Sequence, residues 1–96
     1  VELENTKCVY HQYTIKVPAR DKVHDLLKEK GVMSMIYYPV PMHLQEAFAY
    51  LGLGKGTLPV TEKCTEEVLS LPIFPEITVE QQKQVVNALK EALNEI

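Results

Sequence analysis

Residues 32–45, with the sequence VMSMIYYPVPMHLQ, contain the point at which a predicted strand gives way to a predicted helix. Val32 to Tyr38 form the strand part, and they are apolar on both faces except at Ser34. A strand without a polar face is typical of a position that is covered on both sides of a sheet. We therefore expect this stretch to lie centrally in the fold, with the helix at its far end.

Two prolines stiffen the second part of this stretch, Tyr37 to Gln45. Pro39 and Pro41 each fix their own φ angle, and they bias the preceding residues, Tyr38 and Val40, toward extended backbone. The polar side chains of this block are thus predicted to be displayed on a stiff backbone, which suits contact with a ligand.

Tyr37, Tyr38 and His43 are the candidate site residues of this block. The functional interpretation is that their polar tips face a ligand, since a phenol both donates and accepts hydrogen bonds. The alternative is that the tyrosine rings pack against the core with their hydroxyls in water, while His43 merely starts a helix. Composition alone favours the packing interpretation.

A strand and a short helix are predicted before this stretch. Residues 9–17 alternate with period two, as in a half-buried strand, and Pro18 ends the pattern. The predicted inner face consists of Val9, His11, Tyr13, Ile15 and Val17. In the helix that follows, the apolar positions Val23, Leu26 and Leu27 have helical spacing, Asp21 is the predicted N-cap and Gly31 the stop.

The chain after this stretch is predicted to alternate between helices and loops. Residues 44–51 carry a helical stripe, and residues 51–56, LGLGKG, contain too many glycines for regular structure. These glycines follow a helix rather than a strand, so they indicate a surface loop rather than a phosphate-binding loop. Val60, Cys64 and Val68 are spaced for one face of a third helix, and residues 69–75 are predicted to be an extended edge strand.

The last helix has the clearest local signals. Thr78 to Gln81 has the form of a capping box, and the apolar positions that follow share one helical face. These positions are Val85, Leu89, Ala92, Leu93 and Ile96. The whole pattern predicts one α+β domain over residues 1–96, in which helices pack on a small sheet of about three strands.

Composition excludes several classes of function. The chain has 96 residues, of which 46% are hydrophobic and 24% charged, and no apolar run approaches the roughly 20 residues that span a bilayer. A net charge of -3 without a basic stripe argues against nucleic acid as a partner. Two cysteines form no disulfide framework, and no signal-peptide pattern precedes them, so a cytoplasmic location is expected.

Catalytic and metal-binding patterns are weak within the chain. Cys8 and His11 are a close pair, but a structural zinc site needs four ligands and the sequence offers no second close pair. Ser34 and Ser70 are the only serines, and neither lies in a nucleophile-elbow motif. We therefore expect no metal site and no catalytic residue here.

Five blocks of the sequence together resemble the C-terminal part of the DegT/DnrJ/StrS-type sugar aminotransferases. They match that family in order and spacing from about Cys8 onward, and the blocks YYPVPMHLQ and VLSLPIFP are specific as a pair. The blocks are Tyr10–Val17, Arg20–Asp21, Leu27–Val32, Tyr37–Gln45 and Val68–Pro75. The resemblance implies the C-terminal small domain of a fold-type I, aspartate aminotransferase-like enzyme.

The resemblance also implies a function and a set of partners. Such enzymes use pyridoxal phosphate to move an amino group, usually from glutamate, onto a keto sugar carried on a nucleotide, in cell-surface polysaccharide or deoxysugar biosynthesis. They are usually homodimers. The Schiff-base lysine and most cofactor contacts lie in the preceding, N-terminal domain, so this chain alone is expected to bind no cofactor and to be inactive.

Tyr37, Tyr38 and His43 are the substrate contacts that the resemblance implies, because the tyrosine–proline block borders the active-site cleft in that family. Many members carry histidine at the position of Tyr37, and tyrosine there is a common variant. Two alternatives stay open: a sugar dehydratase of the same fold, or a non-catalytic interaction module. The residue that separates aminotransferase from dehydratase lies outside this chain.

Overall fold

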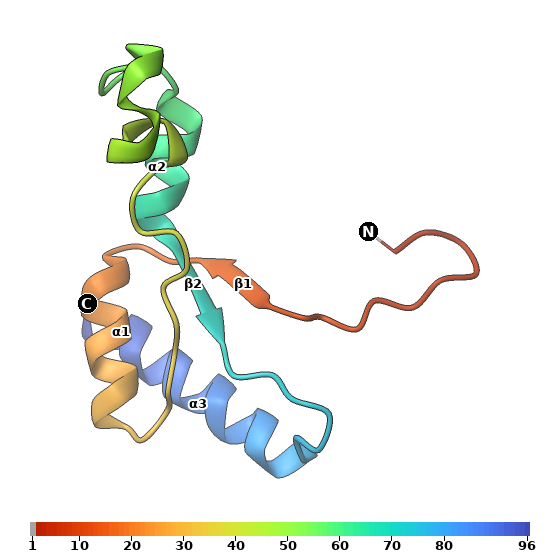
Figure 1. Ribbon diagram of the computed structural model, residues 1–96. Coiled ribbons are helices and arrows are strands. Elements are labelled where there is room, and N and C mark those ends of the chain that lie inside the picture. Colours follow the sequence, from red (N-terminus) through yellow and green to blue (C-terminus); the bar gives the residue numbers. More distant parts are fainter. Residues whose placement is uncertain (1) are drawn as a thin grey trace.

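Two antiparallel strands connect the parts of the molecule in the computed structural model, which describes residues 2–96. Strand β1 (Tyr13–Lys16) pairs with β2 (Val68–Leu71), with Tyr13 opposite Leu71 at one end and Lys16 opposite Val68 at the other. The cross-strand hydroxyls of Thr14 and Ser70 lie 2.8 Å apart and form a hydrogen bond. Figure 1 shows this ribbon at the centre of the molecule.

The second of the three expected strands, Val32–Tyr38, is reduced to a single bridge. Met35 and Ser70 exchange two backbone hydrogen bonds of 2.9 and 2.8 Å, so β2 is central rather than an edge strand. The expectation of two covered faces is wrong for this segment: Val32 and Ser34 are buried, whereas Met33 is 73% exposed. Helices cover one face only, and within residues 2–96 nothing covers Met33 on the other.

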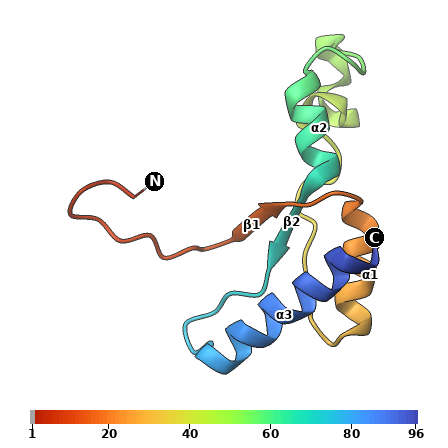
Figure 2. The same ribbon diagram turned by 180° about the vertical axis from the view of Figure 1, so that it is seen from behind.

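Strand β1 is shorter than the predicted strand over residues 9–17. Its partner β2 ends at Leu71, and Pro72 has no N–H with which to continue the ladder. Residues 9–12 therefore lack a partner strand and belong to an arm that leaves the rest of the chain (Figures 1 and 2). Val9, predicted to face inward, is 85% exposed.

Two helices pack on one side of the ribbon and supply the apolar core. They are α1 (Arg20–Glu29) and α3 (Val79–Glu95), which run across one another below the strands in Figure 1. The buried hydrophobic residues are Val17, Val23, Leu27, Val32, Leu69, Ala88 and Ala92. The predicted inner faces of both helices are confirmed, except that Ile96 lies beyond α3 and is exposed.

Of the two predicted end signals of α1, the N-cap is wrong and the C-terminal stop is confirmed. α1 begins after Ala19, not after Asp21, because the Asp21 carboxylate accepts a 2.6 Å hydrogen bond from Arg20 instead of capping the backbone. The predicted stop at Gly31 is confirmed: its φ is 79°, and the hydrogen bonds Gly31 N–H to Lys28 and Val32 N–H to Leu27 form a Schellman motif.

The start of α3 is as predicted. The Thr78 hydroxyl accepts a 3.1 Å hydrogen bond from the Gln81 N–H, and the Gln81 side chain accepts a 2.9 Å hydrogen bond from the Thr78 N–H. These two bonds satisfy donors that a helix start would otherwise leave unpaired.

A separate lobe, residues 37–67, lies on the opposite side of the ribbon from α3. It contains two short 3₁₀ helices, η1 (Met42–Leu44) and η2 (Glu46–Leu51), and the helix α2 (Pro59–Glu67). The single helix expected over residues 44–51 is thus wrong, because Gln45 is extended and separates the two turns. Arg20 of α1 donates a 2.8 Å hydrogen bond to the carbonyl oxygen of Thr65 in the lobe and a 3.0 Å hydrogen bond to that of Val68, the first residue of β2.

The chain is open in shape. Its radius of gyration is 16.1 Å, whereas a compact domain of about 100 residues has one of about 13 Å.

We call residues 13–36 and 68–96, which contain both strands, α1 and α3, the core unit. Within residues 2–96, no helix combines the length and hydrophobicity needed to cross a membrane.

Candidate functional site

A cavity of about 320 Å³ lies where the core unit meets the lobe, and both candidate tyrosines line it. Its walls come from the tyrosine block, from both strands and from one face of α2. The lining residues are Gln12, Thr14, Tyr37, Tyr38, Val60, Thr61, Cys64, Thr65, Val68, Leu69 and Ser70. The structure therefore brings Tyr37 and Tyr38 together with hydroxyl and amide groups that are distant in sequence.

The predicted common face of Val60, Cys64 and Val68 is confirmed, because all three line this cavity. Their helix ends one residue earlier than the spacing suggested, since Val68 is the first residue of β2. The face points toward the cavity rather than into an apolar core.

Tyr38 has an unusual backbone conformation. Its φ is 54°, in the left-handed region, so the extended backbone expected before Pro39 is not found. Left-handed backbone at a side chain other than glycine is strained by roughly 1–2 kcal/mol. The chain changes direction there, between the segment that bridges to β2 and η1, and such strain is concentrated at functional sites. The Tyr38 ring itself is 67% exposed.

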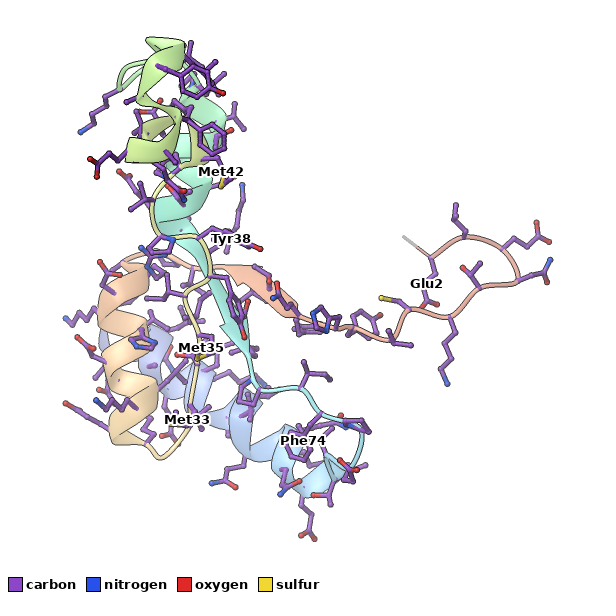
Figure 3. All side chains as sticks on the ribbon, in the orientation of Figure 1. Glu2, Met33, Met35, Tyr38, Met42 and Phe74 are labelled. Atoms are coloured by element: carbon purple, nitrogen blue, oxygen red, sulfur yellow. The ribbon has the colours of Figure 1, made fainter. Side chains whose placement is uncertain are left out.

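A second cavity, of about 260 Å³, adjoins the first and shares Gln12, Tyr37 and Ser70 with it. Its other walls are mainly apolar and include Met35 and Phe74. In Figure 3, Met33 and Met35 lie along the segment that leads to Tyr38, while Phe74 lies on the loop after β2. Tyr37 thus lies between the two cavities and contributes to the walls of both.

His43 lies in different surroundings from the tyrosines. Its side chain is 4% exposed, and it is not among the residues that line either cavity. Its Nε2 atom lies 3.5 Å from an oxygen of Glu62, and within residues 2–96 neither ring nitrogen makes a hydrogen bond. This distance exceeds the 2.7–3.2 Å of an N–H···O hydrogen bond, so the His43 ring contacts the Glu62 carboxylate without a hydrogen bond.

Glu62 is the functional candidate that the sequence did not indicate. Its carboxylate accepts hydrogen bonds from the N–H of Gly56 at 2.8 and 2.9 Å and from that of Leu58 at 3.3 Å. The Gly56 hydrogen bond is the main cause that holds the pKa of this carboxyl below its usual value, although partial burial opposes it. An acidic residue on a polar helix is normally solvated. In the sequence, only the position of Glu62 six residues after Gly56 could have indicated this contact.

The remaining candidates lie elsewhere. His11 is exposed on the arm, and both cysteines are free. His24, on α1, is half-buried, and its Nδ1 forms a 2.7 Å hydrogen bond with the buried hydroxyl of Ser34. Within the described residues, no three His, Cys, Asp or Glu side chains gather as metal ligands would.

Two curated relatives match most of the chain. A pleiotropic regulatory protein of Geobacillus stearothermophilus is 50% identical over 90 residues, which is 94% of this chain and 24% of that protein. A UDP-N-acetyl-3-dehydro-alpha-D-glucosamine 3-aminotransferase of Acidithiobacillus ferrooxidans is 42% identical over 86 residues, covering 90% of this chain and 23% of that protein. The chain therefore spans about a quarter of the length of these relatives.

The fold and a family model agree with these relatives. The crystal structure of DesV from S. venezuelae in complex with a ketimine intermediate superposes with a TM-score of 0.88 at 33% identity, over 100% of this chain and 26% of that one. The family model described as the DegT/DnrJ/EryC1/StrS aminotransferase family matches residues 1–90. The chain belongs to this aminotransferase family.

Proposed function

We propose that the chain is the C-terminal small domain of a pyridoxal-phosphate-dependent aminotransferase that acts on nucleotide-linked keto sugars. In this proposal the domain contributes substrate contacts and closes the cleft, while the bond-making groups belong to the rest of the parent protein. The single observation that carries it is the cavity that brings Tyr37 and Tyr38 against α2 and the strand hydroxyls.

The chemistry of the cavity suits a sugar. Tyrosine and threonine hydroxyls and the Gln12 amide all donate and accept hydrogen bonds, as sugar hydroxyls do. At about 320 Å³ the cavity is at the lower end of ligand sites, which are roughly 300–1,000 Å³. We infer that it receives the sugar ring, with Tyr38 as the main contact, while the nucleotide lies outside it.

The cofactor does not fit this cavity. Pyridoxal phosphate needs a lysine for its aldehyde and cationic or helix-terminal N–H groups for its phosphate. The residues that line the cavity within the described chain include no lysine and no arginine. We therefore place the cofactor in the preceding part of the parent protein.

The open side of the bridge segment supports the inference of a larger parent. Met33, Met35 and Phe74 are 73%, 48% and 42% exposed and lie around the second cavity or beside it. Exposed apolar groups that gather in one region typically mark an interface. In our proposal the N-terminal domain of the same protein, or its partner in a homodimer, covers them.

The test is transamination by the full-length protein. It is incubated with pyridoxal phosphate, glutamate, and UDP- or dTDP-linked keto sugars, and the products are identified by mass spectrometry. We expect an amino sugar and an equal amount of 2-oxoglutarate, and no amino sugar when glutamate is omitted. Loss of water from the sugar without amino transfer would establish the dehydratase alternative, and absence of both reactions would refute the proposed function.

A further inference from the structure

One carboxylate joins three segments of the lobe. Glu62, on α2, accepts the N–H groups of Gly56 and Leu58 at 2.8–3.3 Å, and its Oε2 lies 3.5 Å from the ring of His43. Its side chain is only 14% exposed. Hydrogen bonds to a charged acceptor are stronger than those between neutral groups, so this contact holds the glycine loop firmly against α2.

His43 depends on this carboxylate. A buried imidazole whose nitrogens make no hydrogen bond carries a desolvation cost, and the Glu62 charge is the polar contact that the structure describes for it. The carboxylate is thus a polar contact between α2 and η1.

The position of His43 restricts that of Tyr38. Only four residues separate them, and two of these are Pro39 and Pro41, whose φ angles are fixed. The strained φ of 54° at Tyr38 persists only if the surrounding structure holds both ends of the segment. The bridge at Met35 holds one end, and the contact of His43 with Glu62 holds the other.

Two faces of α2 serve different parts of the lobe. Thr61, Cys64 and Thr65 line the cavity, while Glu62 faces His43 and the glycine loop. One helix thus carries the wall of the cavity and the carboxylate that fixes the tyrosine segment relative to it.

We propose that Glu62 is a positioning residue: through His43 and the glycine loop it holds Tyr38 in its strained conformation at the cavity. It touches no substrate. This inference rests on the proposed function, because it assigns Tyr38 to the substrate.

The experiment compares Glu62→Gln with Glu66→Gln in the full-length protein. Both changes remove one negative charge from α2, but Glu66 is exposed and makes no contact with the glycine loop among the bonds described. Glutamine keeps the shape of Glu62 but offers one acceptor oxygen instead of two. The readouts are KM and kcat for the nucleotide sugar, and amide hydrogen exchange over residues 54–58.

For Glu62→Gln we expect KM to rise roughly tenfold with kcat changed by less than about twofold, since mainly binding geometry is lost. Exchange over residues 54–58 should accelerate several-fold, while α1 and α3 remain protected. Glu66→Gln should match the wild type in both readouts. A far-UV circular dichroism spectrum equal to that of the wild type verifies folding, and if Glu62→Gln does not fold, Glu62→Asp replaces it.

Equal KM and equal exchange in the Glu62→Gln and Glu66→Gln proteins would overturn the positioning role while leaving the proposed function intact. If the wild type transfers no amino group, the proposed function fails. Hydrogen exchange then still decides whether Glu62 holds the loop.

Discussion

The core unit and the lobe are held together by different forces. Every buried hydrophobic residue of the described chain lies in the core unit, whereas His43 is the one buried residue of the described lobe. Burial of apolar surface, about 25 cal/mol per Å², stabilises the first region. Charge-assisted hydrogen bonds to Glu62 organise the second. We infer that apolar packing in the core unit provides most of the stability of the described residues.

The largest expected difference between the two regions comes from replacing one leucine in each by alanine. Leu27 is fully buried between α1 and its neighbours, so Leu27→Ala should lower the free energy of unfolding by about 2–5 kcal/mol. Leu51 in η2 is 50% exposed, and Leu51→Ala should cost less than about 1 kcal/mol. Equilibrium urea unfolding measures both. Equal losses would mean that the lobe has a core of its own.

An intermediate loss of unfolding free energy is expected from a change at the start of α3. Thr78→Ala removes the hydroxyl that accepts the Gln81 N–H, and should cost about 1 kcal/mol of unfolding free energy. Gln82→Ala, one residue beyond the box at an exposed position, is the matched control. If Thr78→Ala is as stable as that control, α3 is held by its packed face alone and the capping box is dispensable.

The smallest effect concerns a surface ion pair of the core unit and depends on pH. The Lys30 ammonium lies 2.9 Å from Glu95 and 3.3 Å from Glu91, and the hydrogen bond to Glu95, followed by that to Glu91, raises its pKa above 10.5. A raised folded-state pKa means that the stabilisation is present below the unfolded value and is lost as pH rises through the folded one.

Melting temperatures of Lys30→Gln and wild type should therefore differ slightly at neutral pH and converge as the pH rises through the raised folded-state pKa of Lys30. Lys22→Gln, at an exposed position of α1, should show no such convergence because its difference is negligible throughout. A Lys30→Gln difference that stays constant into the alkaline range would contradict the ion-pair explanation.

Local signals in the sequence predicted the core unit better than the lobe. The capping box at Thr78, the stop at Gly31 and the apolar faces of α1 and α3 depend on neighbours within a few residues, and all three were confirmed except at Ile96. The strand expected at Val32–Tyr38 depends on a partner along its whole length, and only Met35 has one. The apolar pattern of residues 32–38 does not show how many of them have a pairing partner in a neighbouring strand.

The candidate site was predicted in part. The tyrosine block was recognised from its prolines and polar rings, but the cavity beside Tyr37 and Tyr38 depends on α2, whose residues lie more than twenty positions from these tyrosines. The left-handed backbone of Tyr38 opposes the local preference before proline, so only tertiary contacts explain it. Glu62 escaped notice because its partners are backbone N–H groups, which no side-chain motif records.

The central claim is that the lobe presents Tyr38 to the substrate, and Tyr38→Phe in the full-length protein tests it most directly. The change removes one hydroxyl and keeps the ring, and Tyr50→Phe, at a tyrosine that is 80% exposed and outside both cavities, is the matched control. We predict a loss in kcat/KM for the nucleotide sugar equivalent to about 0.5–3 kcal/mol, up to roughly a hundredfold, with unchanged folding. Unchanged kcat/KM in Tyr38→Phe, equal to that of Tyr50→Phe, would contradict the claim and make the tyrosine block a structural turn.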